Sequence, residues 1–129
     1  MHFVLDTWFL VRLLEGEAEA KQWLREQVRQ HILFVPTICL VELVRVGLDR
    51  GKPWRQMSEF LDGIYQLDRT LNFKLVGMHH RAHVVEAAGK LGHQHKVGVA
   101  DCIVLATAQS LRAAIQTSPK SDVARIAKK

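Results

Sequence analysis

Short, uninterrupted apolar runs alternate along this chain with longer stretches in which apolar residues recur at helical spacing. The short runs have the length and continuity of buried strands, and they cover residues 2–5, 32–35, 73–76 and 113–117. The stretches with helical spacing cover residues 8–14, 18–29, 38–49, 54–68, 79–91 and 100–111. The fourth strand is rich in alanine, and a short basic tail, residues 120–129, follows it. The pattern therefore predicts a chain in which strands and helices alternate.

The character of the predicted strands indicates how they assemble. Strands that are apolar throughout, rather than on alternate residues, are typical of parallel sheets that are covered on both faces. We therefore predict an α/β fold, a three-layer α/β/α sandwich with a central parallel sheet. No repeat, low-complexity segment or linker divides the chain, so residues 1–129 are expected to form a single domain. In such sheets, functional sites lie beyond the carboxyl ends of the strands.

Composition narrows the functional classes. The 129 residues are 48% hydrophobic, which is enough for a packed core and excludes a disordered chain. No apolar run approaches the ~20 residues of a membrane span, and the N-terminus MHFVLD reaches an acid too early for a secretory signal. Two cysteines, Cys39 and Cys102, are too few for a disulfide scaffold, so we expect free thiols and a cytoplasmic location. The 18 Lys and Arg against 13 Asp and Glu, a net charge of +5, favour an anionic partner such as nucleic acid.

Four of the acids stand apart from the rest because they follow predicted strands or lie in apolar surroundings. Asp6 follows the first strand, Glu42 lies inside PTICLVELV, and Asp101 lies inside VGVADCIVLATA. Asp122 comes soon after the fourth strand. Burying a carboxylate is costly unless a cation pairs with it, and one divalent cation can serve several carboxylates. Carboxylate oxygens suit Mg²⁺ or Mn²⁺, which can activate water for phosphodiester hydrolysis.

Local structural roles remain open for the same four residues. Asp6, Asp101 and Asp122 could each cap a helix N-terminus, and Glu42 could pair with Arg45 one turn later. Thr37 is expected to cap the helix over residues 38–49. The joint placement of all four acids near strand ends favours the metal site over separate local roles.

Four segments in this order resemble the PIN-domain ribonucleases, and among them the VapC-type toxins of bacterial and archaeal toxin–antitoxin pairs. They are FVLDTWFLVRLL (3–14), VPTICLVELVRVG (35–47), VADCIVLATAQSL (99–111) and AIQTS (114–118). Each motif alone has low specificity, whereas their order and spacing are characteristic. The resemblance covers nearly the whole chain and implies a PIN-like fold.

The resemblance implies a catalytic and metal-binding site of Asp6, Glu42, Asp101 and Asp122. Many members carry an Asp two residues after the Thr of the last motif, where this chain has Pro119; other members use a later acid, which Asp122 matches. Thr7 and Thr117 are expected to support the carboxylates, and Trp8 stands where an Asn is common.

The activity implied by the resemblance is Mg²⁺-dependent endonucleolytic hydrolysis of RNA by a metal-activated water, with Mn²⁺ as a second suitable ion. The implied partners are an RNA substrate, a cognate antitoxin whose C-terminal segment inhibits the enzyme, and a second copy in a homodimer, with no membrane association. Arg12, Arg45 and Lys52 are candidate RNA contacts.

Two other functional classes remain open at this point. The chain could be a non-catalytic PIN-like module that binds RNA or protein, an interpretation favoured by Pro119. It could also bind zinc through histidines of HHRAH (79–83) and GHQH (92–95), although surface histidines explain these segments more simply. Trp54 could stack on a base or be buried by its helix.

Overall fold

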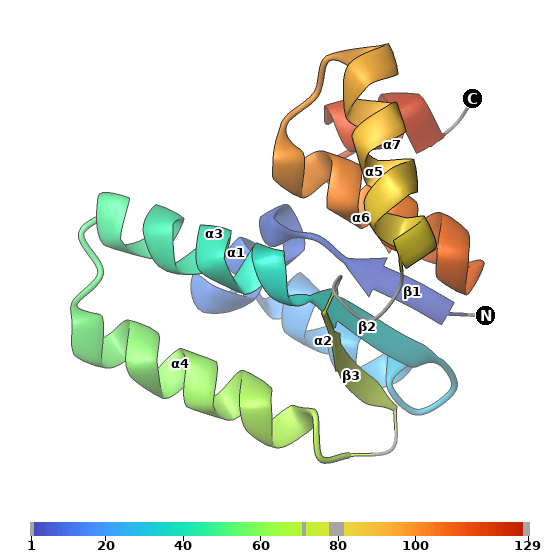
Figure 1. Cartoon of the computed structure of the whole chain (residues 1–129). Helices are drawn as coiled ribbons and strands as arrows, with labels where there is room; N and C mark the ends of the chain where they lie inside the picture. Colours follow the sequence, from blue (N-terminus) through green and yellow to red (C-terminus); the bar gives the residue numbers. More distant parts are fainter. Residues whose placement is uncertain (1, 71, 78–81, 128–129) are drawn as a thin grey trace.

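The computed structural model describes residues 2–70, 72–77 and 82–127, in which four strands alternate with seven helices (Figure 1). The strands are β1 (His2–Leu5), β2 (Ile32–Pro36), β3 (Phe73–Val76) and β4 (Ala114–Gln116). The helices are α1 (Thr7–Leu14), α2 (Ala18–Gln27), α3 (Thr37–Asp49), α4 (Trp54–Leu67), α5 (Ala82–His95), α6 (Val99–Leu111) and α7 (Asp122–Ala127). The four predicted strands and six predicted helices are all found, with small shifts at their ends.

The strands form one parallel sheet in the order β3-β2-β1-β4. Val4 pairs with Phe34 of β2 on one side and with Ile115 of β4 on the other, which makes β1 a central strand. Figure 1 shows α5, α6 and α7 together on one side of the sheet and α1 and α2 on the other. The predicted three-layer α/β/α sandwich with a central parallel sheet is confirmed.

The two central strands contribute buried residues to the core. Val4 and Leu5 of β1 and Leu33 and Val35 of β2 are fully buried. At the edges of the sheet, Phe73 of β3 is also fully buried, whereas Ala114 of β4 is exposed.

Helix α5 continues to His95, four residues beyond the predicted end. The prediction ended at a glycine, but Gly92 lies inside the helix for a packing reason. A Cβ atom on Gly92 would lie 2.7 Å from Sγ of Cys102 in α6, closer than such atoms can approach. The glycine thus allows α5 and α6 to pack closely. The predicted beginning of this helix, residues 79–81, lies outside the described residues.

Two further local expectations need correction. Thr37 is the first residue of α3 rather than its cap, since Pro36 precedes it in an extended conformation and no side chain caps this helix. The apolar pattern predicted no helix of its own over the tail, residues 120–129, yet α7 forms there because Val123, Ala124 and Ile126 are buried against the rest of the molecule. Six residues are too few for a helical pattern to be recognised, so tertiary packing decides this element.

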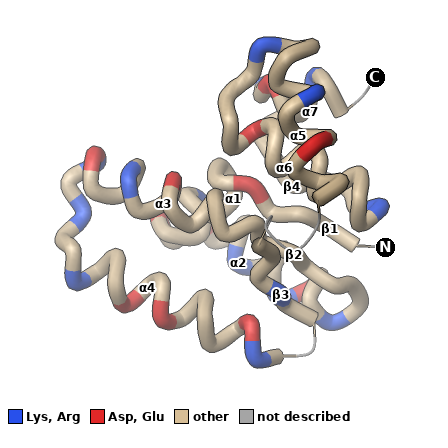
Figure 2. The backbone as a smooth tube through the Cα atoms, viewed as in Figure 1, with Lys and Arg blue, Asp and Glu red and all other residues tan. Residues whose placement is uncertain are grey.

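Helices α3 and α4 form a hairpin that extends away from the sheet (Figure 1). Acidic and basic residues are interspersed along α4 (Figure 2). No helix in the described ranges is both long enough and apolar enough to cross a membrane.

Candidate active site

A pocket of about 260 Å³ lies where β1 and β4 end and where α3 and α6 begin. Its lining comprises Asp6, Thr7, Trp8, Glu42, Asp101, Val104, Ser118, Lys120 and Ser121. Figure 2 shows acidic segments at the junction of β1 with α1, on α3 and on α6. Three of the four acids selected from the sequence, Asp6, Glu42 and Asp101, therefore line one pocket, although they are far apart in the chain.

Asp6 is held by hydrogen bonds to both of its carboxylate oxygens. Oδ1 accepts from the backbone N–H of Phe9 at 3.2 Å and caps α1, while Oδ2 accepts from the hydroxyl of Thr117. Burial raises the pKa of Asp6 to about 6; the hydrogen bonds from Thr117 and Phe9 oppose this shift, and the charge of Asp101 adds to it. The capping role is thus confirmed, and the same carboxylate lines the pocket.

Glu42 is oriented by α1 rather than by its own helix. The hydroxyl of Thr7 donates a hydrogen bond to Oε1 of Glu42 at 2.6 Å, which links the first residue of α1 to α3. The alternative left open for Glu42, an ion pair with Arg45, is not formed; Arg45 is exposed to solvent, whereas Glu42 faces Thr7 and the pocket. The correction follows from tertiary structure, because α1 packs against α3 and supplies the closer partner.

Asp101 lies in the first turn of α6, but Gly98 is the residue that precedes this helix as its N-cap. The alternative left open for Asp101, a helix N-cap, is therefore wrong. Burial raises the pKa of Asp101 above its ordinary value, and the negative charges of Glu42 and Asp122 raise it further. A pKa raised by neighbouring carboxylates indicates negative charges that have been brought together without full compensation.

Asp122 does not line the pocket. It is an exposed residue at the start of α7, and its Oδ1 lies 3.5 Å from Nη2 of Arg125. The hydroxyl of Ser121, not Asp122, caps α7 by accepting from the backbone N–H of Ala124 at 3.0 Å. Asp122 is near enough for its charge to affect Asp101, and its role as a fourth metal ligand stays a prediction.

Three residues of the loop after β4 line the pocket and were missed in the sequence: Ser118, Lys120 and Ser121. The hydroxyl of Ser121 lies 3.1 Å from that of Thr117, so a chain of hydroxyls connects α7 to Asp6. Among the described residues that line the pocket, Lys120 is the only cationic one. The position of these three residues directly after a strand was a signal in the sequence. They were missed because polar residues are ordinary in a loop.

Two of the three candidate RNA contacts are engaged elsewhere. Arg12 pairs with Glu17 at 3.2 Å and Glu19 at 3.6 Å, and Lys52 pairs with Glu15 at 3.3 Å. Arg45 is exposed and lies outside the pocket lining.

Both cysteines are buried free thiols, as predicted. Cys39 lies beneath the site, where burial raises the pKa of its thiol to about 12; hydrogen bonding with Thr7 opposes this shift, and the charges of Asp6 and Glu42 add to it. Cys102 belongs instead to the apolar cluster between α5 and α6.

The donor chemistry of the pocket fits a hard divalent cation such as Mg²⁺. Its ionisable acids are three carboxylates, and none of them forms an ion pair with a lysine or arginine of the described ranges. Among the described residues, no three His, Cys, Asp or Glu side chains converge as a ready-made metal site. Within the same limits no histidine cluster is found; His79 and His80 lie outside the described residues, and His83 Nε2 is 3.0 Å from the Ser110 hydroxyl.

A comparison with protein-family models identifies the family. The model described as "PIN domain" matches residues 3–129, nearly the whole chain. The chain belongs to the PIN-domain family. This family consists of nucleases that usually employ divalent metal ions, and the predicted resemblance is thereby confirmed.

Solved structures of similar fold are toxins of toxin–antitoxin systems. A toxin–antitoxin complex from Klebsiella pneumoniae is 25% identical, with a TM-score of 0.65 over 91% of this chain and 87% of the other. VapBC2 from Rickettsia felis, bound to a fragment of its promoter DNA, is 18% identical, with a TM-score of 0.72 over 93% and 90%. VapC20 from Mycobacterium tuberculosis, a toxin that cleaves the sarcin–ricin loop, is 15% identical, with a TM-score of 0.73 over 96% and 94%. None of the curated protein sequences matches the chain significantly.

Proposed function

We propose that this PIN-domain protein is a metal-dependent endoribonuclease and the toxin of a toxin–antitoxin pair. One observation carries the proposal: Asp6, Glu42 and Asp101, from three separate elements, line one pocket at the carboxyl ends of the strands without a described cationic partner. Such an arrangement is unfavourable in a purely structural role, because like charges are brought together at a partly buried position. A divalent cation would make it favourable.

In the proposed mechanism, Asp6, Glu42 and Asp101 hold Mg²⁺ or Mn²⁺, and Asp122 completes the acidic cluster. When bound, the ion supplies an activated water for hydrolysis and neutralises charge on the scissile phosphodiester. Thr117 orients Asp6 and Thr7 orients Glu42 through their hydroxyl groups. Lys120, in the lining of the same pocket, is suited to attract the RNA phosphate backbone, to which the exposed Arg45 would add charge.

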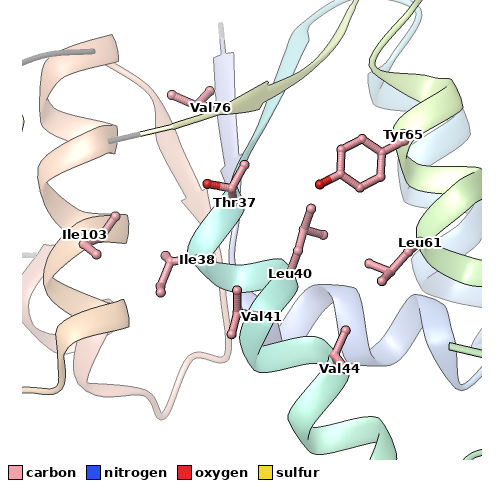
Figure 3. A pocket seen from close by; sticks show the side chains of 9 residues that line it. All are labelled: Thr37, Ile38, Leu40, Val41, Val44, Leu61, Tyr65, Val76 and Ile103. Atoms are coloured by element: carbon pink, nitrogen blue, oxygen red, sulfur yellow. The ribbon is translucent and has the colours of Figure 1, made fainter. Parts of the chain in front are cut away.

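The proposed partners are RNA, a cognate antitoxin and a second copy of the chain. Support for the antitoxin comes from the Klebsiella pneumoniae complex and VapBC2, both solved as toxin–antitoxin assemblies. The chain also has an apolar groove of about 470 Å³ that could receive an antitoxin segment. Figure 3 shows Leu61 and Tyr65 of α4 facing Leu40 and Val44 of α3 across it. The homodimer is proposed from the family resemblance and is tested by the molar mass in light scattering.

Cleavage of RNA by purified protein tests the activity. Asp101→Asn removes one carboxylate charge from the pocket and is expected to reduce Mg²⁺-dependent cleavage by at least about a hundredfold. The matched control is Asp62→Asn, which changes the same functional group at an exposed position on α4. Circular dichroism should show that both variants remain folded.

The opposite outcomes distinguish the alternatives. Undiminished cleavage by Asp101→Asn would show that the Asp101 carboxylate is not needed for catalysis and would contradict the proposed metal site. Wild-type protein that binds RNA but cleaves none with Mg²⁺ or Mn²⁺ would favour the non-catalytic PIN-like module, an interpretation consistent with Pro119 at the usual acid position.

A further inference from the structure

Trp8 is a large aromatic residue in the lining of a pocket whose other side chains include three carboxylates, and neither metal binding nor core packing explains an indole there. It lies two residues after Asp6, lines the same pocket, and keeps 36% of its surface exposed. The other aromatic residues of this region behave differently: Phe9 is fully buried and packs edge-on against Trp23. Packing into the core therefore explains the aromatic residue at Phe9. It does not explain Trp8, whose indole stays partly exposed beside the carboxylates.

The indole of Trp8 is held in position from one side. The guanidinium carbon of Arg12 lies 4.9 Å from the centroid of the Trp8 ring, one turn along α1, in a cation–π contact. Arg12 is itself fixed by ion pairs to Glu17 and Glu19. The arginine thus covers one face of the ring and restrains its rotation, while the remaining exposed surface adjoins the pocket.

From this geometry we propose that Trp8 is a stacking platform for an unpaired RNA base next to the scissile phosphate. The inference rests on the proposed ribonuclease function and specifies its substrate as a single-stranded segment. Bases in a duplex are already stacked on their neighbours, so only an unpaired base can be placed on an aromatic ring of the protein. Because every base has a π-face, the contact selects for unpaired structure more than for sequence.

The proposal also assigns a role to Arg12, which was a candidate phosphate contact. With its guanidinium paired to two carboxylates and stacked on Trp8, Arg12 is a positioning residue that acts through the indole. Its loss should loosen the ring without removing a phosphate contact.

Fluorescence and binding in EDTA test the proposal without relying on cleavage. The full-length protein is titrated with a short single-stranded oligoadenylate, and with the same oligomer carrying one abasic residue at each position in turn. Stacking on Trp8 should quench its fluorescence. Trp8→Phe should lose most of the quenching and Trp8→Ala should weaken binding by about tenfold or more, with Phe intermediate. Trp54→Phe is the matched control, since Trp54 is 61% exposed rather than buried by its helix but lies outside the pocket; quenching lost in this variant instead would assign the stacking to Trp54.

The variant Arg12→Met distinguishes two roles for Arg12: holding the Trp8 ring in position or contacting an RNA phosphate directly. Arg12→Met should weaken binding to a smaller extent and leave the salt dependence of the affinity unchanged. A direct contact between Arg12 and a phosphate would instead lower the slope of log K against log salt by about 0.7.

Two results would overturn the inference. If wild-type protein binds and cleaves RNA but Trp8→Ala binds as tightly as wild type, Trp8 has no stacking role although the proposed function stands. If the wild type neither binds nor cleaves single-stranded RNA, the proposed function fails and the inference fails with it. An affinity insensitive to every abasic substitution would likewise contradict stacking.

Discussion

Asp6 illustrates how one residue can serve local structure and chemistry with opposite effects on stability. Its Oδ1 caps α1, which stabilises the helix, but the charge of the carboxylate is buried beside Asp101. Burial therefore raises its pKa to about 6, so that the folded protein holds a proton that the unfolded chain releases at lower pH. Above the folded pKa, the ionised Asp6 destabilises the metal-free fold.

We predict that Asp6→Asn stabilises the metal-free protein at neutral pH. An Asn side chain can still accept from the N–H of Phe9, and the Thr117 hydroxyl can reverse its role to accept from the amide. Because the folded pKa is raised, wild-type stability falls as pH rises from about 4 to about 6 and then levels off. The variant lacks this loss and should be more stable above pH 6, by at most about 3 kcal/mol.

Denaturant unfolding in EDTA at several pH values measures this difference. Added Mn²⁺ should reverse the order, because it stabilises only a protein that retains its ligands. A metal-free variant less stable than wild type at pH above 6 would contradict the argument.

Thr7 provides a second prediction at this scale. Thr7→Val keeps the shape of the side chain but leaves Oε1 of Glu42 without its donor, so the carboxylate can rotate away from the pocket. Partners that orient metal ligands typically contribute 10- to 100-fold to metal affinity, and we expect a loss of about tenfold in Mn²⁺ affinity by calorimetry. Thr7→Ser retains the hydroxyl and should bind almost as the wild type does; equal loss in both variants would exclude the hydrogen bond as the cause.

In helix α5, two glycines one turn apart are expected to have opposite effects on the stability of the protein. Gly92 and Gly89 lie in the same helix, but only at Gly92 would a Cβ meet another side chain, Sγ of Cys102. The helical propensity of both positions favours alanine by about 1 kcal/mol over glycine. At Gly92, packing between α5 and α6 decides whether a change to alanine raises or lowers the stability of the protein.

We therefore predict that Gly92→Ala destabilises the protein by about 1–3 kcal/mol, whereas Gly89→Ala stabilises it by about 0.5–1 kcal/mol. Thermal or urea unfolding of the pair measures the difference. Combining Gly92→Ala with Cys102→Ala should recover part of the loss, because the sulfur is the atom that the new methyl group meets. A stabilising Gly92→Ala would show that α5 and α6 are not held at this separation.

The elements also show where periodicity succeeds. The strand and helix patterns were found because apolar residues lie where the sheet and its covering helices require them, as in α6, where residues 102–108 are buried. In α3 the same spacing located the helix but not its buried face, since Val41 is 65% exposed and Leu48 44%. The ends of the elements were less well predicted. Thr37 was expected as a cap, yet α3 begins at Thr37 directly after the extended Pro36. The end of α5 was expected near Gly92, yet the helix continues through this glycine, where it packs against Cys102 of α6.

For the whole molecule, the hairpin of α3 and α4 leaves an apolar groove open to solvent beside the sheet (Figures 1 and 3). Val41 lies in its lining and is 65% exposed. An exposed apolar groove of this kind is typical of a surface that binds another protein. The groove and the acidic pocket have separate linings, so partner binding and catalysis can be altered independently.

We predict that Val41→Glu abolishes binding of the cognate antitoxin while cleavage of RNA remains within about twofold of wild type. A charge in the groove must be desolvated by a bound apolar segment, which costs several kcal/mol. Val99→Glu is the matched control, since Val99 is 73% exposed but lies outside the groove. Co-purification and calorimetry with the antitoxin measure the effect, and tight binding by Val41→Glu would exclude this groove.

The class of fold could be predicted from the sequence alone, since continuous apolar strands between amphipathic helices are compatible with few architectures. The sequence also singled out four acids, Asp6, Glu42, Asp101 and Asp122, and three of them line the pocket. Tertiary structure decided which side chains meet: Thr7 rather than Arg45 beside Glu42, Lys120 in the pocket, and Asp122 outside its lining. Local spacing encodes the period of an element, whereas contacts between residues far apart depend on how the elements pack.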